Sequence, residues 1–187
     1  MPRTASAAFL RRLSHHLRQG GLVAYPTESC YGIGCLPRNN RALRRLVRLK
    51  KRPQDKGMIV IGETVEQLQP LLQALDSQTL AALKQQWPAR KTFLLPADHR
   101  LPVLLRGKGR NKLAVRVPDH AGARALCRQL NTPLVSTSCN RAGQRPAKTE
   151  REVRRRFGRQ LMIVGGRIGA ARVPSQIIDW ASGRRLR

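Results

Sequence analysis

Acidic side chains are scarce in this chain of 187 residues. Ten Asp and Glu stand against 37 Lys and Arg, which gives a formal net charge of +27 at pH 7. The basic residues are spread along the chain and alternate with apolar ones, a pattern that favours a folded body with a positive surface over a disordered basic tail. Such a surface attracts polyanions, so nucleic acid or a nucleotide is the expected partner. A merely solvated basic surface is the alternative interpretation of the same excess.

Aromatic residues and long apolar runs are also lacking. Only two Trp, two Tyr and three Phe are present, so stacking platforms for single-stranded bases are not expected and any RNA contact would be mainly electrostatic. No apolar run approaches the ~20 residues of a membrane-spanning helix, and the N-terminal segment lacks the apolar stretch of a secretion signal. We therefore expect a cytoplasmic protein with no membrane partner.

Several common chemical motifs are missing as well. The cysteines, Cys30, Cys35, Cys127 and Cys139, have no CxxC spacing, so reduced, buried thiols are the simplest interpretation and no metal-binding residues are predicted. There is no GxxxxGK[ST] sequence, and Gly32 and Gly34 are not followed by the third glycine of a dinucleotide fingerprint. The histidines lie outside any nucleophile-elbow pattern, so Ser/His/Asp catalysis is poorly supported.

What is present is an alternation of helical and extended patterns without a strict βαβ period. Helices are predicted over residues 6–19, 40–49, 65–75, 77–86, 121–130 and 149–156. Strands are predicted over residues 22–25, 31–35, 58–61, 92–95, 113–117, 134–136, 161–164 and 177–180. No internal repeat or linker interrupts them. The pattern predicts one α+β domain over residues 1–187, with helices covering a mixed sheet.

Three polar segments stand out between these elements. Residues 25–34, YPTESCYGIG, combine hydroxyls with glycines that allow close backbone approach to a ligand, although an ordinary hairpin would look the same. Residues 50–57, KKRPQDKG, form a cationic loop that suits polyphosphate, and a solvated charge run is its alternative interpretation. Residues 136–140, STSCN, follow a buried strand, at the strand end where α/β sheets hold ligands.

Taken together and in this order, these segments resemble the YrdC/TsaC family, the threonylcarbamoyl-AMP synthases. Further matches to the family pattern are Trp87-Pro88 with Thr92, the run from Val115 to His120, Ser138-Cys139-Asn140 and Pro174-Ser175. The resemblance covers essentially the whole chain and is closest to the short, single-domain form. Departures occur at Ala89 and Arg90, where the family has Gly-Pro, and at Gln176, where it has Thr.

The resemblance implies a fold and a reaction. The fold would be a three-layer α+β structure in which helices flank a twisted, mixed β-sheet with a concave basic face. The reaction would join L-threonine, bicarbonate and ATP into threonylcarbamoyl-adenylate and pyrophosphate, which makes the protein a nucleotidyltransferase. ATP would be a substrate accompanied by Mg²⁺. The product would feed threonylcarbamoyladenosine modification of tRNA through other threonylcarbamoylation proteins.

The resemblance also assigns site residues. ATP-binding residues would be Lys50, Arg52, Lys56, Ser138, Asn140 and Ser175, and threonine-binding residues would be Thr27, Arg116 and Ser136. Lys50 and Arg52 would be catalytic, because they neutralise charge that develops as pyrophosphate leaves. We expect both on a loop that is exposed in the absence of ligand. Arg116 would pair with the threonine carboxylate.

A second class of function stays open on the sequence alone. The net charge is compatible with a non-catalytic RNA-binding or ribosome-maturation protein that holds tRNA or double-stranded RNA on the basic concave surface. The ordered set of cations and hydroxyls favours the enzyme, because generic RNA binding needs no such cluster.

Overall fold

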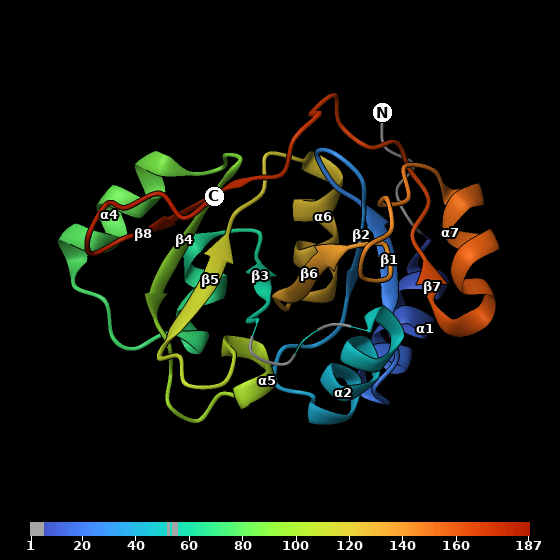
Figure 1. The fold of residues 1–187 in the computed structure, drawn as a ribbon, viewed down its shortest axis with the longest axis horizontal. Helices are drawn as coiled ribbons and strands as arrows, with labels where there is room; N and C mark the ends of the chain where they lie inside the picture. The colour runs from blue at the N-terminus through green and yellow to red at the C-terminus, as the bar shows by residue number, and fades with distance from the viewer. Residues whose placement is uncertain (1–5, 52, 54–55) are drawn as a thin grey trace.

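The computed structural model describes residues 6–51, 53 and 56–187. These residues form a mixed sheet with strand order β7-β1-β2-β6-β3-β5-β4-β8 (Figure 1). The strands are β1 Val23–Pro26, β2 Tyr31–Gly34, β3 Ile59–Ile61, β4 Lys91–Pro96, β5 Lys112–Arg116, β6 Leu134–Ser138, β7 Met162–Ile163 and β8 Gln176–Asp179. The α-helices are α1 Ala7–Arg18, α2 Asn40–Lys50, α3 Val65–Leu68, α4 Ser77–Gln86, α5 Val103–Arg106, α6 Ala121–Leu130 and α7 Glu150–Phe157. Two 3₁₀ turns, η1 Gln69–Leu71 and η2 Gly158–Gln160, complete the set.

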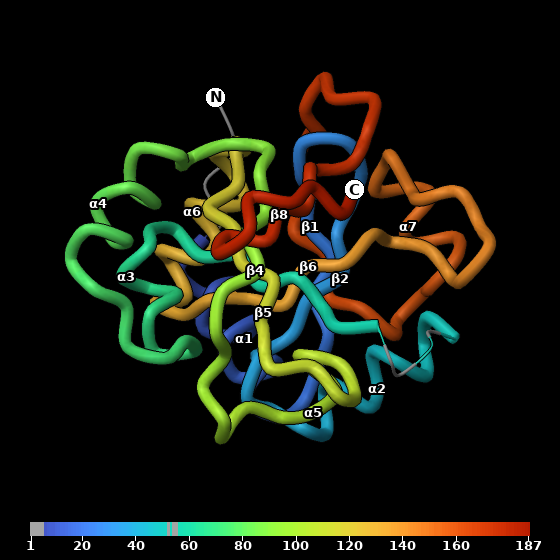
Figure 2. The backbone as a smooth tube through the Cα atoms, turned by 60° about the vertical axis from the view of Figure 1, so that its left-hand side comes forward, coloured from blue at the N-terminus to red at the C-terminus, as the bar shows by residue number. Residues whose placement is uncertain are grey.

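The sheet mixes strand directions. β2 is antiparallel to both β1 and β6, and β6 is antiparallel to β3. β5 runs parallel to β3 and antiparallel to β4. The last strand, β8, returns to pair in parallel with β4, so the C-terminal segment lies beside the middle of the chain (Figure 2). The predicted α+β fold with a mixed sheet is confirmed.

Successive side chains along each strand point to opposite faces of the sheet, and each face has its own hydrophobic core. Val60 and Val135 belong to the larger core, which receives buried residues from α2, α3, α4, α5 and α7. Ile61 and Leu134 point to the opposite face and belong to a smaller core with α1 and α6. Helices therefore cover both faces of the sheet. Further along that second face the same alternation presents Ser136, which lines a cavity.

Helix α2 separates two faces with different chemistry. It begins after Asn39, whose side chain accepts a hydrogen bond from the Ala42 amide at 3.0 Å and caps the helix. Its buried residues recur at helical spacing and are Ala42, Leu43, Leu46, Val47 and Lys50. Its exposed face carries Arg41, Arg44, Arg45 and Arg48. The helix thus turns a lysine inward and four arginines outward.

Most predicted elements lie where the sequence placed them, and two departures have local causes. The helix predicted over 65–75 is wrong in length: α3 ends at Leu68 and a 3₁₀ turn follows. Pro70 lies in that turn and has no N–H to continue an α-helical ladder. Helix α5 was not predicted, because its four residues between Pro102 and Gly107 are too few for a periodic pattern. In the described ranges no helix is long and apolar enough to cross a membrane.

Candidate active site

A cavity of about 480 Å³ opens on the sheet face that also carries the smaller core. Its walls come from the β1–β2 turn, the end of β5, strand β6 and the segment before β8. Five of the predicted site residues line it: Thr27, Arg116, Ser136, Ser138 and Ser175. The structure therefore brings all three predicted threonine-binding residues together with two of the predicted ATP-binding residues.

Arg116, the last residue of β5, is held by a buried carboxylate. Its Nη1 lies 3.2 Å from Oε1 of Glu28, and only 7% of Arg116 and 6% of Glu28 are exposed. The same Glu28 oxygen accepts a hydrogen bond from the Asp119 amide at 3.0 Å. The Arg116 Nε is buried and has no hydrogen-bond partner among the described residues. A buried donor without a partner is costly, and the positive charge of Arg116 lies in the wall of the cavity.

The β1–β2 turn presents Thr27 and is fixed from both sides. The Thr27 hydroxyl donates to the Cys30 carbonyl at 2.8 Å, which leaves its oxygen lone pairs for a ligand. The amides of Gly169 and Ala171 donate to the carbonyls of Thr27 and Glu28 at 2.9 and 3.1 Å. The C-terminal segment therefore packs along the turn and limits its movement.

Gly32 on β2 lets two of these hydroxyl residues approach each other. A Cβ at this position would lie 3.2 Å from Cγ2 of Thr27 and 3.3 Å from Oγ of Ser136. Both distances are shorter than an ordinary carbon contact. The glycine thus allows β2 and β6 to bring Thr27 and Ser136 to the same wall.

Lys50 does not lie on an exposed loop, and that expectation is wrong. It is the last residue of α2 and is 4% exposed. Its Nζ donates to the carbonyls of Ser138 and Asn140, the latter at 2.7 Å, and lies 3.5 Å from Oδ1 of Asn140. The physical reason is helical spacing: Lys50 follows buried Leu46 by four residues and so shares its inward face. Lys50 ties α2 to the end of β6 from behind the cavity.

Asn140 is also engaged within its own loop. Its Nδ2 donates to the carbonyls of Arg141 and Gln144 at 3.0 and 2.7 Å. Neither Asn140 nor Lys50 is among the described residues that line the cavity. Together they fix the segment that follows Ser138. Lys56 is exposed and does not line the cavity either, and Arg52 lies outside the described residues.

Ser175 lines the cavity from the C-terminal side. Its Oγ lies 3.0 Å from Oγ1 of Thr92, which is fully buried on β4. Its carbonyl accepts from Nε of Arg187 at 3.2 Å. Gln176, the departure from the family pattern, is exposed and outside this wall. The hydroxyl of Ser175 is thus held by Thr92, a residue that matched the family pattern but to which the sequence assigned no role.

Further cations surround these hydroxyls, and sequence reasoning assigned none of them to the site. They are Arg90, Arg145, Lys148, Arg172 and Arg187. Arg90 is one of the family departures, and its Nη2 donates to the Val173 carbonyl at 2.6 Å. The carboxylate among the described lining residues is Glu28, which Arg116 engages. The cavity is therefore strongly positive and suited to phosphate and carboxylate groups.

Thiol and metal chemistry find little support in the same residues. Cys30 lines the cavity, but burial raises the pKa of its thiol, so the nucleophilic thiolate is scarce near neutral pH. Burial also raises the pKa of Cys139 to about 12. Among the residues that the structure describes, no group of three or more His, Cys, Asp or Glu is placed to hold a metal ion.

The fold is α+β, and the cavity on its mixed sheet is lined by cations and hydroxyls of the kind that suit small anions. The Sua5_yciO_yrdC family model, whose description reads "Telomere recombination", matches residues 15–187. The chain belongs to this family, and the resemblance drawn from the motifs is confirmed.

Curated relatives match over nearly their full length. The chain is 63% identical over 186 residues to the threonylcarbamoyl-AMP synthase of Neisseria meningitidis serogroup A, covering 100% of this chain and 98% of that protein. It is 51% identical over 175 residues to the threonylcarbamoyl-AMP synthase of Thiobacillus denitrificans, covering 94% and 93% of the two chains.

Solved structures share the fold. P. abyssi Sua5 complexed with L-threonine matches with a TM-score of 0.83 and 29% identity over 97% of this chain. The match covers 53% of the P. abyssi chain, so this protein spans about half of it. E. coli YciO matches with a TM-score of 0.78 and 26% identity, covering 95% of this chain and 86% of that one.

Proposed function

We propose that this protein is a transferase that forms threonylcarbamoyl-AMP for tRNA threonylcarbamoylation. The observation that carries the proposal is the cavity itself: a guanidinium held by Glu28, hydroxyls from the β1–β2 turn, β6 and the segment before β8, and several further cations. The 63% identity to a protein named threonylcarbamoyl-AMP synthase supports the same function. The relatives' names favour the enzyme over a non-catalytic RNA-binding protein.

Threonine is proposed to bind at the wall formed by Thr27, Arg116 and Ser136. Arg116 lines the cavity while its Nη1 stays on Glu28, so its guanidinium is positioned to pair with the threonine carboxylate. The Thr27 and Ser136 hydroxyls then accept or donate hydrogen bonds to the amine and hydroxyl of threonine. The solved complex of P. abyssi Sua5 with L-threonine supports this substrate class.

ATP is proposed to place its phosphates between Ser138, Ser175 and the lining cations. Lys148 and Arg172 are exposed on the rim, where they can neutralise charge on a leaving pyrophosphate. Arg145 also lines the rim, but its Nη2 is paired with Glu152 at 3.0 Å. Lys50 contributes in two ways: it holds the Ser138–Asn140 segment, and it places a positive charge directly behind that segment. Arg52 and Lys56 stay predictions as phosphate ligands.

The proposed reaction balances without a covalent enzyme intermediate. The threonine amine attacks the carbon of bicarbonate and water leaves, which gives a carbamate. A carbamate oxygen then attacks the α-phosphorus of ATP, the bond to the β-phosphate oxygen breaks, and pyrophosphate departs. Because AMP moves to the carbamate, the activity is that of a nucleotidyltransferase. The protein acts by orientation and charge stabilisation.

Magnesium does not fit a protein-held site in this cavity. The carboxylate of Glu28 is already engaged by Arg116 and the Asp119 amide. We propose that Mg²⁺ enters on the ATP phosphates, as hard cations that keep much of their water commonly do. No step is assigned to the ion.

A pyrophosphate-release assay with ATP, threonine and bicarbonate, each omitted in turn, tests the proposal. We expect release that requires all three substrates and a product that contains AMP joined to carbamoylated threonine. Release without threonine would identify a simple ATP pyrophosphatase, and no release under any condition would refute the proposed activity.

A further inference from the structure

Arg90 directly precedes β4, is half-buried and lines the candidate active site. It is one of the positions at which this chain departs from the family pattern, which has proline here. A proline side chain offers no hydrogen-bond donor, whereas a guanidinium offers five. This chain therefore has a charged donor at the edge of the cavity where the pattern has none.

Residues 172–175 form one wall of the candidate active site, and we name them the wall segment. The segment begins after Ala171, whose amide donates to a carbonyl of the β1–β2 turn at 3.1 Å. It ends at Ser175, whose hydroxyl oxygen lies 3.0 Å from that of Thr92. The three residues before Ser175 are exposed. The segment is thus anchored at both ends and has an exposed middle.

Arg90 ties this exposed middle to the sheet. Its Nη2 donates to the Val173 carbonyl at 2.6 Å, and its own carbonyl accepts from the Gln176 amide at 3.0 Å. Within the described part of the chain, residues 172–174 make no hydrogen bond other than the one from the Arg90 side chain. Because its donor is charged, this bond is stronger than one between neutral groups. Its loss should let the middle of the segment move.

The wall that Arg90 braces is thin. Arg90, Val173 and Pro174 line the active-site cavity on one side and a smaller hollow of about 280 Å³ on the other. Val173 is 62% exposed, so burial of its side chain does little to hold the segment. The position of the wall therefore depends on its polar contacts.

The wall segment carries two groups that are proposed above to meet ATP, the Ser175 hydroxyl and the Arg172 guanidinium. We propose that Arg90 is a positioning residue for ATP, which holds the wall segment against β4 and keeps these two groups at the cavity. Thr27 and Arg116 are fixed by other contacts, so the threonine wall should not depend on Arg90. The inference rests on the proposed function, because it concerns ATP at the same site.

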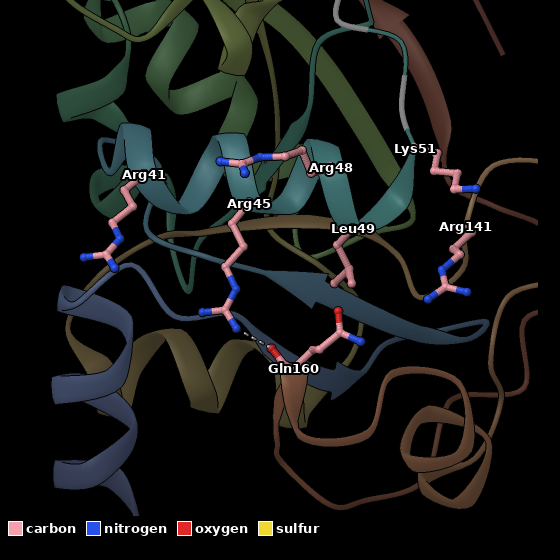
Figure 3. A pocket seen from close by; sticks show the side chains of 7 residues that line it. All are labelled: Arg41, Arg45, Arg48, Leu49, Lys51, Arg141 and Gln160. Atoms are coloured by element: carbon pink, nitrogen blue, oxygen red, sulfur yellow. Dashed lines mark hydrogen bonds between the residues drawn. The ribbon is translucent and has the colours of Figure 1, made fainter.

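A second arginine makes a similar bond away from the cavity and provides a matched control. Arg45 of α2 donates through Nη2 to the Gln160 carbonyl at 3.3 Å, drawn as a dashed line in Figure 3. Neither Arg45 nor Gln160 lines the candidate active site. Arg90→Met and Arg45→Met therefore remove the same charge and the same kind of bond, but only the first does so at the cavity.

Two measurements that need no turnover test the role: hydrogen exchange of the ligand-free protein by mass spectrometry, and ATP binding by calorimetry. In Arg90→Met we expect amide exchange at residues 173–176 to rise about tenfold, because a charge-assisted hydrogen bond no longer holds the segment. The Kd for ATP should also rise about tenfold, because ATP must then order the segment when it binds. Arg45→Met should change neither quantity by more than about twofold.

A conservative variant and the kinetics separate positioning from a general structural role. Arg90→Lys keeps a charged donor, so exchange and the Kd for ATP should return to within about threefold of the wild type. In pyrophosphate release, Arg90→Met should raise KM for ATP about tenfold and leave KM for threonine within about twofold. An equal rise of both KM values would show a general distortion of the cavity and overturn the proposal.

The other outcomes are also decisive. Weaker ATP binding with unchanged exchange in ligand-free Arg90→Met would make Arg90 a direct phosphate ligand, and faster exchange with unchanged ATP binding would separate the wall segment from ATP. Loss of protection throughout the sheet would show that Arg90 supports the fold as a whole. Each of these results overturns the positioning role. Failure of the proposed function has a different signature: the wild type would bind ATP, with the Arg90 effects on binding and exchange intact, but would release no pyrophosphate.

Discussion

Two buried charges, Lys50 and Glu28, hold the walls of the cavity from behind. Lys50 fixes the carbonyls at the end of β6, and Glu28 fixes the guanidinium of Arg116. A buried charge that loses its partner is costly, so each pair couples the fold to the site. Substitutions at these residues should therefore report on both stability and substrate binding.

Lys50→Met should destabilise the protein by about 2–4 kcal/mol, because the Ser138 and Asn140 carbonyls lose their buried donor. Urea unfolding measures the change. Lys51→Met is the matched control, since Lys51 is exposed and next in the chain, and it should change stability by less than about 0.5 kcal/mol. A Lys50 variant as stable as the wild type would show that the lysine is not structural.

Glu28→Gln should raise KM for threonine by about tenfold and leave KM for ATP nearly unchanged. The substitution removes the charge that orients Arg116, so the guanidinium pairs less well with the threonine carboxylate. Steady-state pyrophosphate release gives both constants. Glu150→Gln, which breaks an exposed pair with Arg154, should alter neither. An equal rise of both KM values would indicate a general loss of fold and not a positioning role.

At the scale of elements, the periodic patterns predicted α4 and α6 at their observed bounds. Asp76 and His120 accept the hydrogen bonds that begin these helices, so local capping agrees with the hydrophobic pattern. The burial of Lys50 was not foreseen, because the predicted helix ended at residue 49 and the lysine was assigned to a loop. One further residue of helix decides whether its side chain faces the core or the solvent.

The candidate site likewise contains residues that the sequence could reveal and residues that only the structure reveals. Thr27, Arg116 and Ser136 could be predicted to lie together, since each belongs to a motif of the family pattern at or next to a predicted strand. Arg145, Arg172 and Arg187 could not, because only the return of the C-terminal segment beside β4 and the fold of the loop after β6 bring them to the cavity. No local pattern in an arginine-rich chain distinguishes a lining arginine from a solvated one.

The β2 strand offers an element-scale test at Gly32. Gly32→Ala places a methyl group against Thr27 and Ser136, which must each move by a few tenths of an ångström. We expect KM for threonine to rise about tenfold, with a stability loss of about 1 kcal/mol from crowding. Gly122→Ala, on α6, would crowd the His120 ring to a similar degree but lies outside the cavity lining, so it should leave KM for threonine unchanged. Unchanged threonine kinetics in Gly32→Ala would show that this wall does not bind threonine.

At the scale of the whole molecule, the two cores lie on opposite faces of one sheet. Each contains a fully buried thiol, Cys35 in the larger core and Cys127 in the smaller one. Burial raises the pKa of both thiols to about 12. The pH dependence of stability therefore reports whether the two cores unfold together.

The sign follows from proton binding. An unfolded thiol has a pKa of about 8.5, so between about pH 8.5 and 12 the unfolded chain has lost a proton that the folded protein keeps. Stability is then fully present below about pH 8.5 and falls as pH rises, by about 1.4 kcal/mol per thiol between pH 7.5 and 9.5. Urea unfolding of the reduced protein at the two pH values measures this loss.

The loss of unfolding free energy between pH 7.5 and 9.5 should become smaller by the same amount in Cys35→Ala and in Cys127→Ala. The reason is that cooperative unfolding exposes both cores at once. The comparison uses each variant against itself at two pH values, so the cost of the cavity left by the substitution cancels. Cys30→Ala should change the pH dependence less, since Cys30 is only partly buried. If only one of the two core variants flattens the dependence, the faces of the sheet unfold separately, and the sheet does not join its helices into a single cooperative unit.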